Sequence, residues 1–148
     1  MTATSISANR LRMITSQYSA PAVEAAAFDP IAPGGVDHFD YDLSADAGAA
    51  QMIETTWTCT FDAGESDAVD EDPQARIIEA WITNSIAVSP SADSEANPRP
   101  VTYYGWFSVA RIGNMPPSAA GGSYRPVAST QFDDGRYCTA SVSLPLKP

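Results

Sequence analysis

Two stretches indicate the fold class most clearly: HFDYDL at residues 38–43 and IETTWTCTF at residues 53–61. Each alternates apolar and polar side chains, and a period of two is typical of a half-buried β-strand, because successive side chains point to opposite faces. In the first stretch the set predicted to face a core is Phe39, Tyr41 and Leu43, and the set predicted to face water is His38, Asp40 and Asp42. In the second stretch the predicted core side is Ile53, Thr55, Trp57, Cys59 and Phe61.

The rest of the chain repeats this alternation in short runs. Further strands are predicted over Arg76–Trp81, Asn84–Ser89, Val101–Ile112, Tyr124–Phe132 and Tyr137–Leu146. The last two are joined by Asp133-Asp134-Gly135-Arg136, and Asp-Gly between alternating runs predicts a tight hairpin, because glycine adopts the positive φ that the turn needs. The predicted core side of the final strand is Cys138, Ala140, Val142, Leu144 and Leu146.

About seven short strands without a sustained helical period predict an all-β fold, an Ig-like antiparallel β-sandwich. The 148 residues suit a single core. We expect residues 1–32 to form an irregular N-terminal arm, extended or disordered until docked, and residues 33–148 to form the sandwich. In the arm, Arg10 and Arg12 interrupt the apolar run that a secretory signal requires, and nothing in the chain approaches a membrane span.

The charge of the chain restricts its partners. Eighteen acidic residues oppose eight basic ones, giving a formal net charge of −10, which disfavours nucleic acid because phosphates attract Lys and Arg. The densest acidic run, residues 62–72, does not have the ligand spacing of an EF-hand and is predicted to be a solvated loop. Residues 89–100, with three prolines, are predicted to be an exposed insertion.

The sequence shows no constellation of catalytic residues. The single histidine, His38, lies on the polar side of its strand without a Ser or Cys motif beside it. The pairs Gly34-Gly35 and Gly121-Gly122 lack the pattern of a phosphate-binding loop. We therefore expect a protein that is not an enzyme and needs no cofactor or metal.

The two cysteines, Cys59 and Cys138, both lie on predicted core sides. Free cysteines are among the most buried residues, so reduced core thiols are one interpretation. The other is a disulfide formed in an oxidising medium, which requires Cα atoms within about 7 Å.

A resemblance rests on short motifs in a fixed order. They are Phe28-Asp29-Pro30; Val36-Asp37 with Phe39, Tyr41, Asp42, Leu43 and Ser44; Ile53 to Trp57; Gly121 or Gly122 with Tyr124; and Asp134-Gly135-Arg136. In this order the chain, from Phe28 to Leu146, resembles the phage fibre-tail adaptor proteins, a family of tailed-phage virion proteins. The arm before Phe28, the acidic run and the 89–100 insertion depart from that pattern.

The resemblance implies a virion structural protein, assembled in the host cytoplasm, that joins tail fibres to the tail or neck. Its partners would be other tail, neck or fibre subunits, in a multimeric ring or in repeated copies, with no membrane or nucleic acid bound. Under this interpretation the arm docks on a neighbouring subunit through Leu11, Met13, Ile14 and Tyr18; on composition alone it is equally a disordered tail.

Two alternatives remain open from the sequence. One is an Ig-like capsid decoration or collar protein, which would share the fold. The other is a cellular carbohydrate-binding or adhesion module, since sandwiches serve many functions. A sugar-binding surface would need a planar row of exposed aromatic side chains, for which the one cluster is Tyr103, Tyr104, Trp106 and Phe107.

Overall fold

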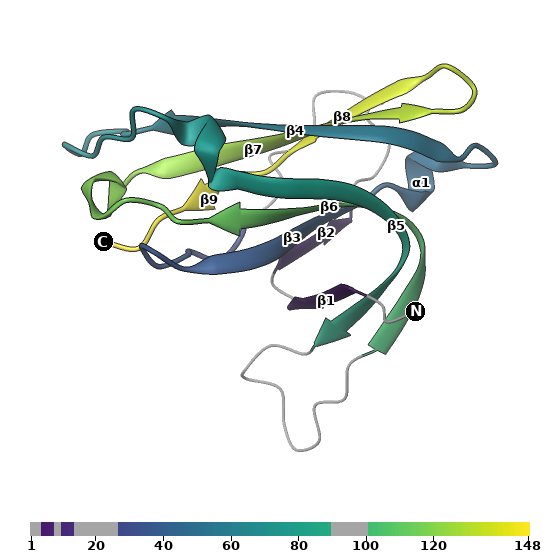
Figure 1. Ribbon diagram of the computed structural model, residues 1–148, viewed down its shortest axis with the longest axis horizontal. Helices are drawn as coiled ribbons and strands as arrows, with labels where there is room; N and C mark the ends of the chain where they lie inside the picture. Colours follow the sequence, from purple (N-terminus) through teal and green to yellow (C-terminus); the bar gives the residue numbers. More distant parts are fainter. Residues whose placement is uncertain (1–3, 8–9, 14–26, 90–100) are drawn as a thin grey trace.

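The computed structural model describes residues 4–7, 10–13, 27–89 and 101–148, which fold into two stacked β-sheets (Figure 1). The strands are β1 (Thr4–Ser7), β2 (Leu11–Met13), β3 (Val36–Asp42), β4 (Met52–Asp62), β5 (Ile77–Ser89), β6 (Val101–Gly113), β7 (Ser123–Phe132), β8 (Tyr137–Ser141) and β9 (Leu144–Pro145). The helical segments are α1 (Ser44–Ala47) and two 3-10 turns, η2 (Pro73–Arg76) and η3 (Pro117–Ala119). No helix within the described ranges has the length and hydropathy needed to cross a bilayer.

The predicted all-β sandwich is confirmed. One sheet has the order β1-β5-β6-β3-β2, and the other has the order β4-β7-β8 with β9 also paired to β7. The pairs among β3 to β9 are antiparallel, whereas β1 pairs with β5, and β2 with β3, in parallel. These two parallel strands come from the segment that the sequence assigns to the arm, so its described part lies at the edges of the five-stranded sheet.

The main core fills the space between the sheets, and Tyr41 of β3 crosses it. The Tyr41 hydroxyl donates to the Pro126 carbonyl at 2.8 Å and accepts from the Val142 amide at 2.9 Å. The Tyr41 ring stacks on the Trp57 ring with centroids 4.8 Å apart. A polar tip that reaches backbone partners on the opposite sheet fixes how the two sheets are aligned, because a buried hydroxyl must be hydrogen-bonded.

A second apolar cluster lies on the outer side of the five-stranded sheet. Its buried members are Ile86, Val88, Phe107 and Val109, with half-buried Leu11 and Trp81 packed against them. The sequence prediction that Asp40 faces water is wrong: Asp40 is 0 % exposed. Its side chain belongs to the predicted polar face, but that face is covered here, since β5 curves and β1 comes close to β3.

The prediction that Ile53 faces the core is also wrong. Ile53 is 55 % exposed, whereas the adjacent Met52 is buried. The pairing of β4 with β7 shifts between Met52 and Glu54, and such a β-bulge adds one residue to the strand, which reverses the alternation on its far side. Trp57 and Cys59, beyond the bulge, keep their predicted inward orientation.

The predicted hairpin between β7 and β8 is confirmed. Gly135 has a φ of +88°, and its amide donates to the Phe132 carbonyl at 3.0 Å. Arg136 then joins the hairpin to α1 by donating to the carbonyls of Asp46 at 2.9 Å and Ala47 at 3.1 Å. This contact satisfies carbonyls at the end of a one-turn helix. The buried residues of the final segment match the predicted core side from Cys138 to Leu146.

Replacement of the Trp57 side chain tests the main core. We expect Trp57→Ala to lower the free energy of unfolding by roughly 3–5 kcal/mol, because it removes a buried aromatic ring stacked on Tyr41. The matched control is Ile53→Ala, on the exposed bulge of the same strand, which is expected to change stability by no more than about 0.5 kcal/mol. Urea denaturation of the variants measures both, and equal losses would contradict the inward and outward assignments.

Candidate interaction surface

The residues predicted to mediate docking divide between described and undescribed parts of the chain. Leu11 is half-buried and packs on the outer cluster of its own sheet, and it makes further contacts. Met13 is the last residue of β2, in register with Asp42. Ile14 and Tyr18 lie outside the described residues. The structure therefore places Leu11 against its own domain rather than on an open surface.

Arg10 anchors this N-terminal segment, a role that no motif in the sequence indicates. Its guanidinium pairs with the Asp37 carboxylate at 3.1 Å and donates to the carbonyls of Asp29 and Pro30. It also lies over the Phe39 ring, 4.8 Å from the centroid. Arg10 is only 7 % exposed. A buried guanidinium with several oxygen partners and a ring beneath it is a strong attachment, since each of its three nitrogens has an oxygen partner.

The far end of the β5–β6 hairpin exposes large apolar side chains. Val101, Tyr103 and Tyr104 are 52 %, 49 % and 82 % exposed. Val101 and Tyr103 lie on one face of β6 and Tyr104 on the other, and we call this end of the hairpin, with both of its faces, the hairpin surface. Figure 1 shows β5 and β6 curving together away from the four-stranded sheet, with β1 alongside the end of β5. Exposed aromatic side chains on a projecting element are typical of protein–protein contacts.

The four-residue aromatic cluster does not form a planar row. Trp106 is half-buried against the main core, and Phe107 is buried in the outer cluster. Tyr103 and Tyr104 are consecutive residues of one strand, so their side chains leave opposite faces. At Gly105 a Cβ would lie 2.2 Å from Ser44 Oγ, the atom that accepts a hydrogen bond from the Trp106 amide at 3.0 Å. A side chain at position 105 would displace the Ser44 hydroxyl and break this hydrogen bond.

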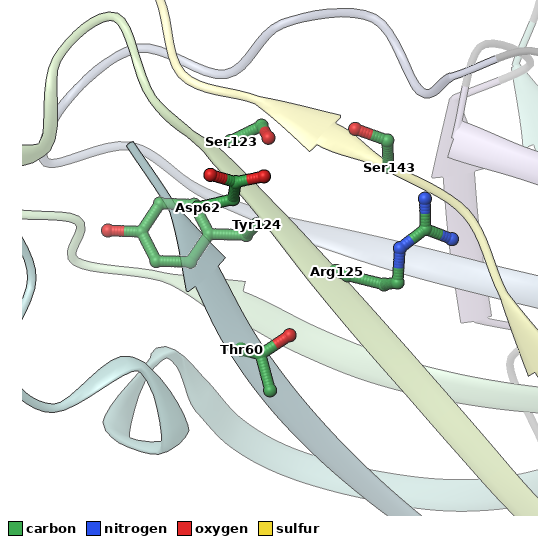
Figure 2. Close-up of a pocket in the computed structure, with 6 residues that line it drawn as sticks. All are labelled: Thr60, Asp62, Ser123, Tyr124, Arg125 and Ser143. Carbon is green, nitrogen blue, oxygen red and sulfur yellow. The ribbon is translucent and has the colours of Figure 1, made fainter. Parts of the chain in front are cut away.

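A polar depression lies on the outer face of the four-stranded sheet (Figure 2). Its lining residues are Thr60 and Asp62 of β4, Ser123, Tyr124 and Arg125 of β7, and Ser143. Arg125 donates to Ser141 Oγ at 3.2 Å, and Asp62 accepts from the Gly64 amide at 2.8 Å. The volume of about 200 Å³ is below the roughly 300–1,000 Å³ of small-molecule sites, and the lining is not the apolar surface that such sites present.

The acidic loop is attached more firmly than the sequence predicts. The Asp70 side chain is only 2 % exposed, pairs with Arg76 at 3.1 Å, and accepts a hydrogen bond from the Tyr124 hydroxyl at 2.5 Å. Burial, followed by this hydrogen bond, raises the Tyr124 pKa well above its usual range. In the described ranges no three acidic, histidine or cysteine side chains gather as a metal site. Asp70 is therefore a structural anchor.

Both cysteines are buried free thiols. Cys138 is opposite Thr130, which is opposite Thr55, so Cys59 lies two strands away and four residues along the sheet. With a rise of about 3.3 Å per residue and a strand spacing of about 4.8 Å, their Cα atoms are roughly 16 Å apart. This separation is more than twice the limit for a disulfide.

His38 is half-buried rather than exposed. Its ring meets the Trp81 ring edge-on, with centroids 5.6 Å apart. On the neighbouring strand, its register partner is Arg111. These contacts are those of a side chain that covers part of the outer cluster.

No protein-family model and no curated protein sequence matches this chain. The fold and its surfaces therefore carry the functional argument.

The thiols give a prediction about reactivity and alkaline stability. Burial, with nearby Asp70 for Cys59 and the Asp46 hydrogen bond for Cys138, raises each thiol pKa from 9.0 to about 12. The thiolate fraction at pH 8 then falls roughly a thousandfold, so native protein should be alkylated far more slowly than urea-unfolded protein. Stability should also fall as the pH rises from about 9 to 12, because only the unfolded chain releases these protons. A thiol that reacts equally fast in both states would contradict burial.

The anchor of the acidic loop gives a second prediction. Tyr124→Phe removes the hydroxyl that donates to the buried Asp70 carboxylate and is expected to lower the free energy of unfolding by about 1.5–3 kcal/mol. Tyr104→Phe, at a strongly exposed tyrosine, is the control and should be neutral within about 0.5 kcal/mol. Urea midpoints of the two variants make the comparison, and equal midpoints would show that the hydrogen bond does not stabilise the loop.

Proposed function

We propose that this chain is a non-enzymatic structural protein of a tailed-phage virion, an adaptor that joins tail fibres to the tail or neck. The observation that carries the proposal is the hairpin surface, three exposed apolar side chains on a hairpin that curves away from the sandwich. An adaptor needs a rigid domain with a projecting contact element. The motif order that resembles the fibre-tail adaptor family supports the same function.

The core explains why such a domain would withstand assembly forces. Inter-sheet hydrogen bonds from Tyr41 join strands that are distant in sequence. Ser108 Oγ accepts from the Trp57 indole at 2.8 Å and lies 2.5 Å from Thr55 Oγ1, which joins β6 to β4. Contacts between strands far apart in the sequence make local opening costly, and a joint in a particle benefits from that rigidity.

The partners that suit the hairpin surface are other virion subunits with an apolar recess and a neutral or basic rim. Tyrosine side chains contribute large contact area together with a polar tip, which is why they are enriched in interface centres. The net charge of −10 disfavours an acidic partner. Repeated copies around a ring would present this surface several times, so that a modest single contact becomes a stable attachment.

Incorporation into particles tests the function. We expect mass spectrometry of purified particles to find this chain in a fixed copy number. Tyr103→Ser combined with Tyr104→Ser should reduce that number at least tenfold by removing two exposed contact residues, without changing the urea midpoint. Ile53→Ser, at an exposed apolar residue on another element, is the matched control and should be incorporated normally.

The outcomes separate two claims. Absence of the wild-type chain from particles would contradict a virion role. Normal incorporation of the double variant would contradict docking through the hairpin surface while leaving the virion role intact. Deletion of the N-terminal segment is a less selective test, because Arg10 is part of the folded domain.

A further inference from the structure

A carboxylate lies within an apolar row on the outer side of the five-stranded sheet. The row runs across four strands: Leu11 of β2, Asp40 of β3, Val109 of β6 and Trp81 of β5. Val109 and Asp40 are each 0 % exposed, and Leu11 and Trp81 pack on the same cluster. Asp40 therefore has an apolar neighbour on both sides.

Asp40 lacks the compensation that a buried charge requires. Among the described residues, neither of its carboxylate oxygens has a hydrogen-bond partner. Burial, and secondarily the charge of Asp42, raises the pKa of Asp40 well above its usual range. Transfer of an unpaired carboxylate out of water is strongly unfavourable, so the folded state favours the protonated form.

The charged groups that face Asp40 do not replace a partner. On β3 they are His38 and Asp42, which follow the same side of the strand. On β6 the nearest is Arg111, in register with His38, and its guanidinium is 3.5 Å from the Glu79 carboxylate of β5. In β1 and β2 the ionisable residue is Arg12, which is in register with Tyr41 rather than with Asp40.

The cover over this side of the sheet comes from short strands. β2 has three residues and β1 has four, and both pair in parallel at opposite edges of the sheet. Parallel pairs are slightly less stable per residue than antiparallel ones, and short edge strands open most readily. β2 borders Asp40 directly, and β1 lies close to β3. Departure of these strands would return water to the Asp40 carboxylate.

We propose that β1 and β2 form a releasable strap, closed over Asp40 when its carboxyl group is protonated and opened when it is ionised. The strap is a property of the folded domain and does not depend on the virion role. In the closed state the carboxyl group is neutral and buried beside Leu11. In the open state it is hydrated, and the outer edge of β3 is available for another strand to pair with.

The sign of the pH effect follows from proton linkage. The closed state holds the proton with a raised pKa, whereas in the open state the pKa is the ordinary value of about 3.9. Between these two pKa values the closed state binds more protons, so a rise in pH favours opening. The opening equilibrium constant should increase up to tenfold per pH unit over that interval and level off above the pKa of the closed state.

Hydrogen exchange followed by mass spectrometry tests the strap on the full chain between pH 4 and pH 7. Asp40→Asn keeps the side-chain shape without the charge. Exchange of peptides containing β1 and β2 should be similar in wild type and Asp40→Asn at pH 4, and at least tenfold faster in wild type at pH 7. Peptides from β4 and β7 should not differ. Asp67→Asn, at an exposed carboxylate, is the matched control and should behave as wild type.

Two results would overturn the proposal. One is equal exchange of β1 and β2 in wild type and Asp40→Asn at every pH. The other is a difference spread evenly over all strands, which would mean global destabilisation instead of a local strap. If Asp40→Asn fails to fold, the wild-type protein alone still tests the strap, with the peptides of β4 and β7 as the internal reference. The ratio of the exchange rate of β1 and β2 to that of β4 and β7 should rise with pH. A ratio that stays constant would refute the strap.

Discussion

The two hydrogen bonds of the Tyr41 hydroxyl set how the two sheets of the sandwich are aligned. The Tyr41 side chain leaves the middle of β3, crosses the core, and meets the Pro126 carbonyl and the Val142 amide on the opposite sheet. Apolar packing is non-directional, so it holds two sheets together without fixing how they slide over one another. Buried hydrogen bonds impose that geometry, because a displaced hydroxyl would leave a donor and an acceptor unsatisfied.

Two further polar contacts extend this constraint around the molecule. Ser108 accepts a hydrogen bond from the Trp57 indole, and Asp70 accepts one from the Tyr124 hydroxyl. Each joins segments more than forty residues apart in the sequence. These hydrogen bonds fix the positions of the strands that carry the outer surface. The β5–β6 hairpin, which carries the hairpin surface, begins directly after Arg76. A rigid base with an exposed apolar tip is suited to attachment within an assembly.

The five-stranded sheet is also covered on its outer side around Asp40, whereas an antiparallel sheet commonly leaves one face to water. β1 and β2 contribute to this cover, under which Asp40 is buried. Arg10 ties the segment to β3 and to the chain at Asp29 and Pro30. Asp40, beside β2, has no hydrogen-bond partner among the described residues. In the proposed strap, attachment through Arg10 and the burial of an unpaired carboxylate therefore act on the same segment in opposite directions.

The sequence alone predicted β3, β4, β6 and β7, the inward set from Cys138 to Leu146 and the Asp-Gly hairpin, because alternation and turn chemistry are local properties. It did not predict β1 and β2, and it divided β5 into two strands. The remaining features depend on long-range packing. The bulge at Met52 and Glu54 turned Ile53 outward, and no local pattern encodes the extra residue. Alternation distinguishes two faces of a strand but does not say whether the second face is covered, so it wrongly predicts that Asp40 faces water. The partners of Arg10 and Asp70 depend on long-range packing, which brings together residues that no spacing in the sequence relates.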